Sequence, residues 1–262
     1  MNGMPAWAEE TVTVAGAGLR IASGGSGPPL LVLHHDIGSP DRPAFHEALA
    51  ARFSVLAPSH PGYDGSERPA WLRSVRDVAV LYQGWLAERG VRAVTLVGLG
   101  FGGWIAAEMA TMAPRDVHRL VLVGAMGLKP ERGEILDQAI LSYLDYARAG
   151  FHDPGGLERA YGPEVPTALL ERWDVNRETT FRIAWRPYMY SPTLPHLLGA
   201  VRAPALVVWG REDRVVPLEC GERYVKTLPD ARLWVLDGVG HFVDLERPAE
   251  LARAVIDFAA GP

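Results

Sequence analysis

The fold is decided by residues 94–104, which read Val-Thr-Leu-Val-Gly-Leu-Gly-Phe-Gly-Gly-Trp. The apolar and β-branched residues 94–97 are typical of a buried strand. The glycines that follow indicate a sharp turn, and the apolar, alanine-rich residues 104–110 favour a helix. The stretch therefore predicts a strand, a tight corner and a helix.

The centre of this corner lacks a side chain. A strand–corner–helix unit with the pattern Gly-x-Ser-x-Gly is a nucleophile elbow, which presents a serine hydroxyl at the end of a sheet. Here the pattern falls on residues 98–102, and the serine position is Gly100. Glycine suits the strained dihedral angles of such a turn but offers no hydroxyl. An acyl-enzyme therefore cannot form at this residue.

Composition indicates one ordinary globular domain. A chain of 262 residues that is 48% apolar can bury a large core. The formal net charge of −5 gives no basic field for nucleic acid or a membrane surface. The single cysteine, Cys220, allows no internal disulfide, and the first ten residues do not read as a signal peptide. We expect a cytoplasmic protein with a small-molecule substrate, and the sequence leaves its oligomeric state open.

Strand and helix patterns alternate along most of the chain, which predicts an α/β fold with a doubly wound, mostly parallel sheet. An N-terminal β-hairpin is expected from strands 11–14 and 19–22 around a turn at 16–18. Further strands are expected at 30–33, 53–57, 120–123, 205–209 and 233–236, and helices at 75–89, 134–149 and 249–259.

Residues 127–200 break this alternation. They contain repeated prolines and many aromatic residues, and they lack strand character. We interpret them as a helical lid inserted between two parts of a core domain, residues 1–126 and 201–262. Trp173, Trp185 and Tyr188 are candidate substrate contacts; the alternative is that they only fasten the lid to the sheet.

Two further motifs follow strands. Asp213 comes directly after the strand at 205–209, and His241 follows the strand at 233–236 in the same way. Ligands of open α/β sheets bind at these carboxyl ends. With the elbow, the chain order is nucleophile, acid, histidine. On these motifs the chain resembles the α/β-hydrolase superfamily in its lid-bearing form, over residues 30–258.

The resemblance implies roles for several residues. Asp213 matches the acid that fixes the histidine tautomer, and His241 matches the general base. The oxyanion hole would use the backbone N–H of Phe101 and one from His35 or Asp36. The loop that holds these two departs from the His-Gly start usual in the family, and the sequence gives no role for their side chains.

Each candidate has a plainer interpretation. Asp213 would merely cap a turn, and His241 would be a polar core residue. Ser66 fits a turn-stabilising role better than that of a replacement nucleophile, and Cys220 fits that of a small hydrophobe. We expect no cofactor, and no metal site either, because consecutive residues such as those of 34–36 do not easily face one ion.

Three functions are compatible with a His–Asp pair beside a glycine. The first is hydrolysis of a small to medium, mostly apolar ester or activated carbonyl compound by water that His241 deprotonates. The second is proton transfer without hydrolysis, as in a lyase, an isomerase or a cofactor-independent oxygenase. The third is binding of a small molecule without catalysis, by a natural pseudo-hydrolase or by a chain whose serine was deliberately replaced. The retained acid and base favour an enzyme. The apolar Leu99 favours a native Gly100, since alanine is the usual choice for a deliberate replacement. Family analogy favours hydrolysis.

Overall fold

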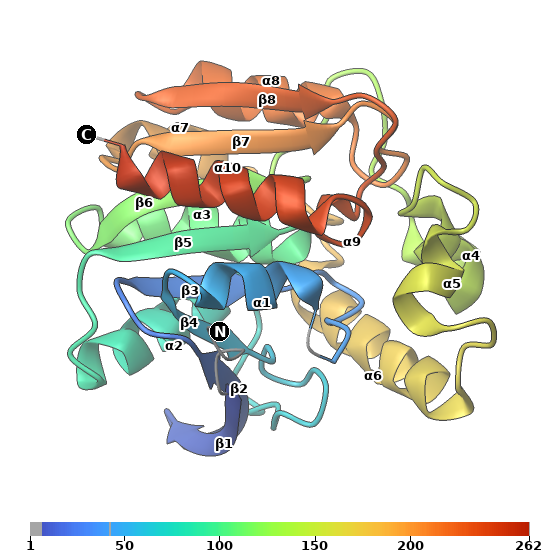
Figure 1. The fold of residues 1–262 in the computed structure, drawn as a ribbon, viewed down its shortest axis with the longest axis horizontal. Coiled ribbons are helices and arrows are strands. Elements are labelled where there is room, and N and C mark those ends of the chain that lie inside the picture. Colours follow the sequence, from blue (N-terminus) through green and yellow to red (C-terminus); the bar gives the residue numbers. More distant parts are fainter. Residues whose placement is uncertain (1–6, 42, 262) are drawn as a thin grey trace.

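The computed structural model describes residues 7–41 and 43–261 and contains one eight-stranded sheet (Figure 1). Its strand order is β1-β2-β4-β3-β5-β6-β7-β8. β2 pairs antiparallel with β1 and β4, whereas all other neighbours pair parallel. The mostly parallel sheet predicted from the sequence is confirmed. The strands are β1 (Trp7–Val14), β2 (Ala17–Gly24), β3 (Pro29–Leu33), β4 (Ser54–Pro58), β5 (Val94–Leu99), β6 (Val117–Val123), β7 (Ala205–Gly210) and β8 (Ala231–Leu236).

Helices cover both faces of the sheet and form a core on each side (Figure 1). Because β5 is covered on both faces, all six of its residues are buried, as its continuous apolar pattern predicts. One face carries α1 (Ala44–Ala50), α9 (Val243–Glu246) and α10 (Pro248–Ala260), and the other carries α2 (Val75–Glu88), α3 (Phe101–Met112) and α8 (Leu218–Thr227).

The N-terminal hairpin forms as expected, but its turn lies nearer the N-terminus than predicted. Val14 pairs with Ala17, so the loop consists of Ala15 and Gly16 alone. Both have positive φ, 49° and 82°. Two-residue hairpin loops need such dihedral angles because they match the right-handed twist of the strands.

A group of helices lies beyond the carboxyl ends of the parallel strands (Figure 1). This segment contains η1 (Gln138–Ile140), α4 (Tyr143–Ala149), α5 (Gly156–Tyr161) and α6 (Thr167–Ala184). The chain then continues through α7 (Leu194–Leu197) into η2 (Leu198–Ala200), which contacts α3. The last part of the expected lid segment thus lies against the core.

The single helix expected over residues 134–149 is wrong. The backbone N–H of Leu136 donates to Val215 O, and that of Gln138 donates to the Tyr188 hydroxyl. In the interior of a continuous helix, backbone N–H groups would instead donate to backbone carbonyls four residues earlier. The helix α4 begins only after Ser142, whose Oγ accepts from the backbone N–H of Asp145 at 3.1 Å.

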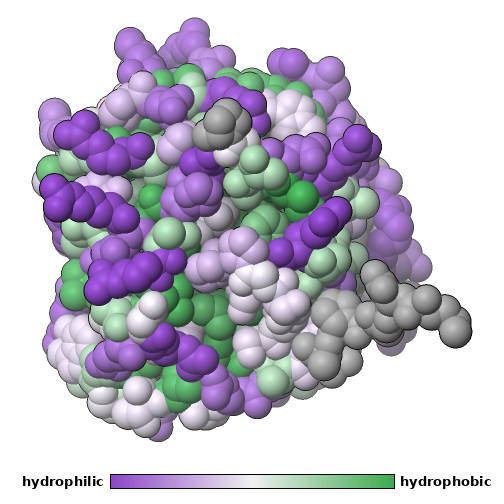
Figure 2. All heavy atoms as spheres, turned by 60° about the vertical axis from the view of Figure 1, so that its left-hand side comes forward, coloured by the Kyte–Doolittle hydropathy of each residue, from purple (hydrophilic) through white to green (hydrophobic). Residues whose placement is uncertain are grey.

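The surface mixes polar and apolar residues. Figure 2 shows hydrophilic and hydrophobic side chains interspersed over the left-hand side of Figure 1, where the parallel strands begin. Within residues 7–41 and 43–261, none of the helices has both the length and the apolar character needed to cross a bilayer.

Candidate active site

The corner after β5 has the geometry of an elbow. Gly100 has φ +53° and ψ −111°, a conformation that side chains rarely adopt, and α3 begins at the next residue. Position 102 requires a glycine because the backbone of Leu33 and His34 lies so close that a Cβ there would collide with it. Its N–H donates to His34 O at 3.0 Å, which fixes the corner against the loop after β3.

The structure brings Asp213 and His241 together beside this corner. His241 Nδ1–H donates to Asp213 Oδ2 at 2.8 Å, and both side chains are fully buried. Asp213 also caps its turn, because Oδ1 accepts from the N–H groups of Val215 and Val216 at 2.8 Å. The capping and acid interpretations of Asp213 are therefore compatible.

The ring of His241 points its second nitrogen at the elbow. A Cβ placed on Gly100 would lie 2.9 Å from His241 Nε2, and this nitrogen is buried without a hydrogen-bond partner. Burial on its own would lower the pKa of His241. The charge and hydrogen bond of Asp213, together with the charges of Asp36 and Asp244, outweigh that effect and raise the pKa.

The side chain of His35 enters the same corner. Its Nδ1 would lie 2.6 Å from the Cβ on Gly100, so this imidazole takes the space next to the missing serine. Its Nε2–H donates to Asp244 Oδ1 at 2.8 Å, which leaves Nδ1 as a buried acceptor without a partner. Sequence reasoning missed Asp244. The available signal was its position three residues after His241, on the short helix α9.

Asp36 is buried between the corner and residues 138–146. Its Oδ2 accepts from the Tyr146 hydroxyl at 2.7 Å and from Gln138 Nε2, whereas Oδ1 has no partner. The neighbouring His35 and Asp36 do face one point: ligand atoms of these two residues and of His241 all lie within 4.8 Å of one another. The expectation that consecutive residues here do not share a metal face therefore does not hold for this pair. Tyr146 and Gln138 carried no recognisable signal in the sequence.

The first backbone N–H groups of α3 lie at the elbow. Phe101 is the first residue of α3, where N–H groups have no intrahelical acceptor. The N–H of Gly102 is already used by His34 O. Among the described residues, no hydrogen-bond acceptor is found for the N–H of Phe101, so its assignment to an oxyanion hole stays a prediction.

The three aromatic candidates lie in different surroundings. Trp173 is buried and packs edge-on against Tyr161. Trp185 is 41% exposed and contacts Phe181 and Tyr188. The Tyr188 hydroxyl accepts from Gln138 N at 2.9 Å and donates to Leu136 O at 3.0 Å, so it supports the residue that holds Asp36.

Other polar candidates have structural partners. Ser66 Oγ accepts from Arg20 N and donates to Ser59 O at 2.9 Å, which fits the turn-stabilising interpretation. Cys220 is buried in α8, and burial raises the pKa of its thiol to about 12. His34 uses both ring nitrogens, toward His35 O and from His60 N, and has none left for the corner.

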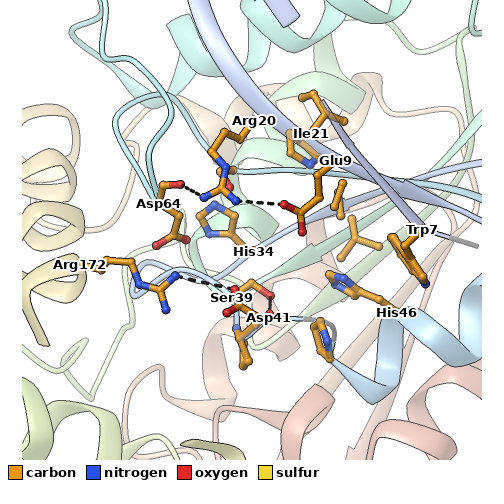
Figure 3. A pocket seen from close by; sticks show the side chains of 17 residues that line it. Trp7, Glu9, Arg20, Ile21, His34, Ser39, Asp41, His46, Asp64 and Arg172 are labelled. Carbon is orange, nitrogen blue, oxygen red and sulfur yellow. Dashed lines mark hydrogen bonds and ion pairs between the residues drawn. The ribbon is translucent and has the colours of Figure 1, made fainter. Parts of the chain in front are cut away.

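His34 lines a separate cavity of about 340 Å³ (Figure 3). Strands β1 and β2, the loop after β3, and α6 contribute to it. Arg20 and Arg172 both line it and are paired with Glu9 and Asp41, respectively. Its described lining includes His34 but not His35, Asp36 or His241, so this cavity and the Gly100 corner are separate.

The sequence also matches known proteins. A model of the alpha/beta hydrolase family matches residues 30–254. This chain belongs to that family. The 2-hydroxy-6-oxononadienedioate/2-hydroxy-6-oxononatrienedioate hydrolase of Paraburkholderia phymatum is 28% identical over 222 residues, covering 79% of this chain and 77% of that protein. An uncharacterized hydrolase of Bacillus subtilis is 26% identical over 222 residues, covering 80% and 81%.

Solved structures have the same fold. A bacterial membrane phospholipase A superposes with a TM-score of 0.83 at 25% identity, covering 98% of this alpha/beta hydrolase and 87% of that chain. A 2-hydroxy-6-oxo-6-phenylhexa-2,4-dienoate hydrolase of a Rhodococcus strain gives a TM-score of 0.78 at 22% identity, covering 97% and 98%. The second likeness shows the fold alone.

Proposed function

We propose that this alpha/beta hydrolase cleaves a carbonyl compound by direct attack of water, without an acyl-enzyme. The observation that carries the proposal is His241 Nε2, which is buried, without a partner and aimed at the space in front of Gly100. Asp213 holds the opposite nitrogen as donor, so Nε2 is the acceptor of this ring. A nitrogen that can accept a proton, with no serine hydroxyl beside it, is suited to deprotonating a water molecule.

His241 and two backbone N–H groups carry out the steps of this reaction. His241 Nε2 takes a proton as the water oxygen bonds to the carbonyl carbon. The oxyanion that forms accepts from the N–H of Phe101 and from one N–H of the loop that holds His35 and Asp36. The bond to the leaving group then breaks, and the leaving group takes the proton from His241. The products are an acid and the released alcohol or carbon acid.

The substrate class is a small to medium, mostly apolar ester or activated ketone. Similarity to hydrolases named for 2-hydroxy-6-oxo dienedioates makes a 6-oxo dienoate a suitable first ketone to test. Trp173, Trp185 and Tyr188 are our proposed substrate contacts on the lid segment. Because the side chains of Asp213 and His241 are fully buried, we expect the lid segment to move aside when substrate enters.

The test measures hydrolysis of p-nitrophenyl acetate and of a 2-hydroxy-6-oxo dienoate. We expect His241→Ala to lower kcat by about 10²-fold or more, whereas His118→Gln, at an exposed histidine on β6, keeps full activity. Hydrolysis in H₂¹⁸O should place the label in the acid product, and intact mass spectrometry should find no acyl adduct and no labelling by a fluorophosphonate.

Three results would contradict this function. Full activity of His241→Ala would remove the base. Strong fluorophosphonate labelling would mean that another serine, such as Ser66, is nucleophilic. Tight retention of an unaltered carbonyl compound that is indifferent to His241→Ala would identify a binding protein instead.

A further inference from the structure

We infer that His35, Asp36 and His241 form a binding site for one divalent transition-metal ion in front of Gly100. Each residue offers one ligand atom, and these atoms all lie within 4.8 Å of one another. The atoms left free for an ion are His35 Nδ1, Asp36 Oδ1 and His241 Nε2. The three residues are 3%, 0% and 0% exposed. Each of these atoms is buried and has no hydrogen-bond partner.

All three atoms are acceptors. Asp244 fixes His35 with its proton on Nε2, and Asp213 fixes His241 with its proton on Nδ1, both at 2.8 Å. Two imidazole lone pairs therefore face a carboxylate oxygen, with no donor among them. Buried acceptors left unpaired are costly, so a set of three that converge calls for a cation or a donor between them.

The supporting residues have the arrangement found around metal-binding histidines. Such histidines donate their other ring N–H to a carboxylate or carbonyl, which orients the ring and raises its basicity as a ligand. Here each histidine has its own buried aspartate, and Asp36 is oriented by Tyr146 and Gln138. A histidine that serves only packing has no need of this support.

The charge of the corner favours a cation. Asp36, Asp213 and Asp244 all have buried carboxylates. Within residues 7–41 and 43–261, no hydrogen bond or ion pair joins any of them to a lysine or arginine. Buried charges are costly unless they are paired or coordinate a metal, and a divalent ion would offset two of these three.

Gly100 leaves space beside the imidazoles of His35 and His241. A Cβ on Gly100 would crowd His35 Nδ1 at 2.6 Å and His241 Nε2 at 2.9 Å. The glycine keeps this space open for an ion and for a further, non-protein ligand. Two histidines and one carboxylate with an open position are the ligand set of hydrolytic zinc sites and of non-haem iron(II) sites.

A bound ion would change how water is activated. It would use the lone pair of His241 Nε2 and lower the pKa of its own bound water, in place of deprotonation by His241. In this respect the inference rests on the proposed hydrolysis. Binding of the ion itself does not depend on that reaction.

The experiment titrates the chelator-treated full chain with Zn²⁺ by calorimetry and with Co²⁺ by visible absorption. We expect one ion per chain and Co²⁺ bands of low-symmetry coordination. His35→Gln and Asp36→Asn should each weaken binding by about 100-fold or more, and Asp244→Asn by about 10–100-fold through the orientation of His35. The surface variant His118→Gln should bind as the wild type does.

Circular dichroism of each variant tests whether it is folded, and the wild-type titration decides the question without any variant. Absence of stoichiometric Zn²⁺ and Co²⁺ binding by the wild type, as expected if the corner holds only water, would overturn the inference. So would folded His35→Gln and Asp36→Asn proteins with wild-type affinity. Hydrolysis that persists in the chelated protein would refute metal activation but leave the proposed function intact. Metal binding without any hydrolysis would support the metal site and contradict the proposed function.

Discussion

The imidazole rings of His35 and His241 lie with their centroids 5.1 Å apart, and each donates a hydrogen bond to a different buried aspartate. A nucleophile elbow normally presents a serine to one histidine. In this chain a second histidine lies beside that position, with its Nδ1 2.6 Å from where a Cβ on Gly100 would be. The corner therefore has a glycine at the nucleophile position and a second imidazole acceptor next to it.

Restoring the serine alone should not restore a nucleophile. In Gly100→Ser the new Cβ would overlap His35 Nδ1, so we expect a loss of about 1–3 kcal/mol in unfolding free energy and slow fluorophosphonate labelling. The double variant Gly100→Ser/His35→Gly removes the obstruction and should label readily. Intact mass spectrometry and urea unfolding measure both effects.

The matched control is Gly100→Ser/His35→Gly/His241→Ala, which keeps the hydroxyl and removes the base. It should not label. Rapid labelling of Gly100→Ser at wild-type stability would show that His35 does not occupy the serine's space.

Asp213→Asn should impair catalysis with little effect on the fold. The asparagine oxygen can still accept from Val215 and Val216, but its NH₂ group would face His241 Nδ1 and favour the wrong tautomer. In the serine-protease triad this change lowers kcat by about 10⁴-fold, and we expect at least 10²-fold here. Steady-state kinetics on p-nitrophenyl acetate measure the loss.

Asp257→Asn, at an exposed aspartate of α10, serves as the control and should leave kcat unchanged. Unaltered kcat in a folded Asp213→Asn protein would remove Asp213 from the mechanism.

The fold was predictable because its strongest signals are local. Runs such as residues 94–97 and 205–209 are continuous and apolar, and they became β5 and β7, buried on both faces. The helix expected over residues 134–149 failed for a tertiary reason: Val215 and Tyr188 take the backbone bonds that a helix needs at 136–138. No local pattern contains that information.

The site was predictable only in part, for the same reason. Asp213 and His241 follow strands, so their place at one edge of the sheet could be read from chain order. The partner of His35, Asp244, is 209 residues away, and that of Asp36, Tyr146, is 110 residues away. The sequence does not reveal which loop residue turns its side chain inward, because packing across such distances decides it.

Stability should fall as the pH is lowered from 6.5 toward 4. His46 is buried, and burial lowers its pKa from 6.5 to about 4, so the unfolded chain binds a proton before the folded one does. The stability is complete above pH 6.5 and is lost as the pH falls through this window. The shift corresponds to about 3 kcal/mol of unfolding free energy. Burial also lowers the pKa of His60, so protonation of this residue adds to the loss of stability at low pH.

Urea unfolding at pH 7.5 and at pH 4.5 measures this dependence. His46→Leu removes the titrating group and should show a smaller loss between the two pH values than the wild type. An identical loss in both proteins would mean that His46 is protonated in the folded state as readily as in the unfolded chain.

Gly124, directly after β6, should prove necessary for the His–Asp pair. It has φ +55°, and a Cβ there would lie 3.0 Å from His241 Nδ1 and 3.4 Å from Asp213 Oδ2. We expect Gly124→Ala to push the imidazole away from the elbow and to lower kcat at least tenfold, with about 1–2 kcal/mol lost in stability from the positive φ. Gly90→Ala is the matched control, because Gly90 has φ +67° with nothing within 4 Å of its added Cβ. It should lose similar stability and keep full activity, so equal kcat values for the two variants would show that the backbone at 124 does not position the pair.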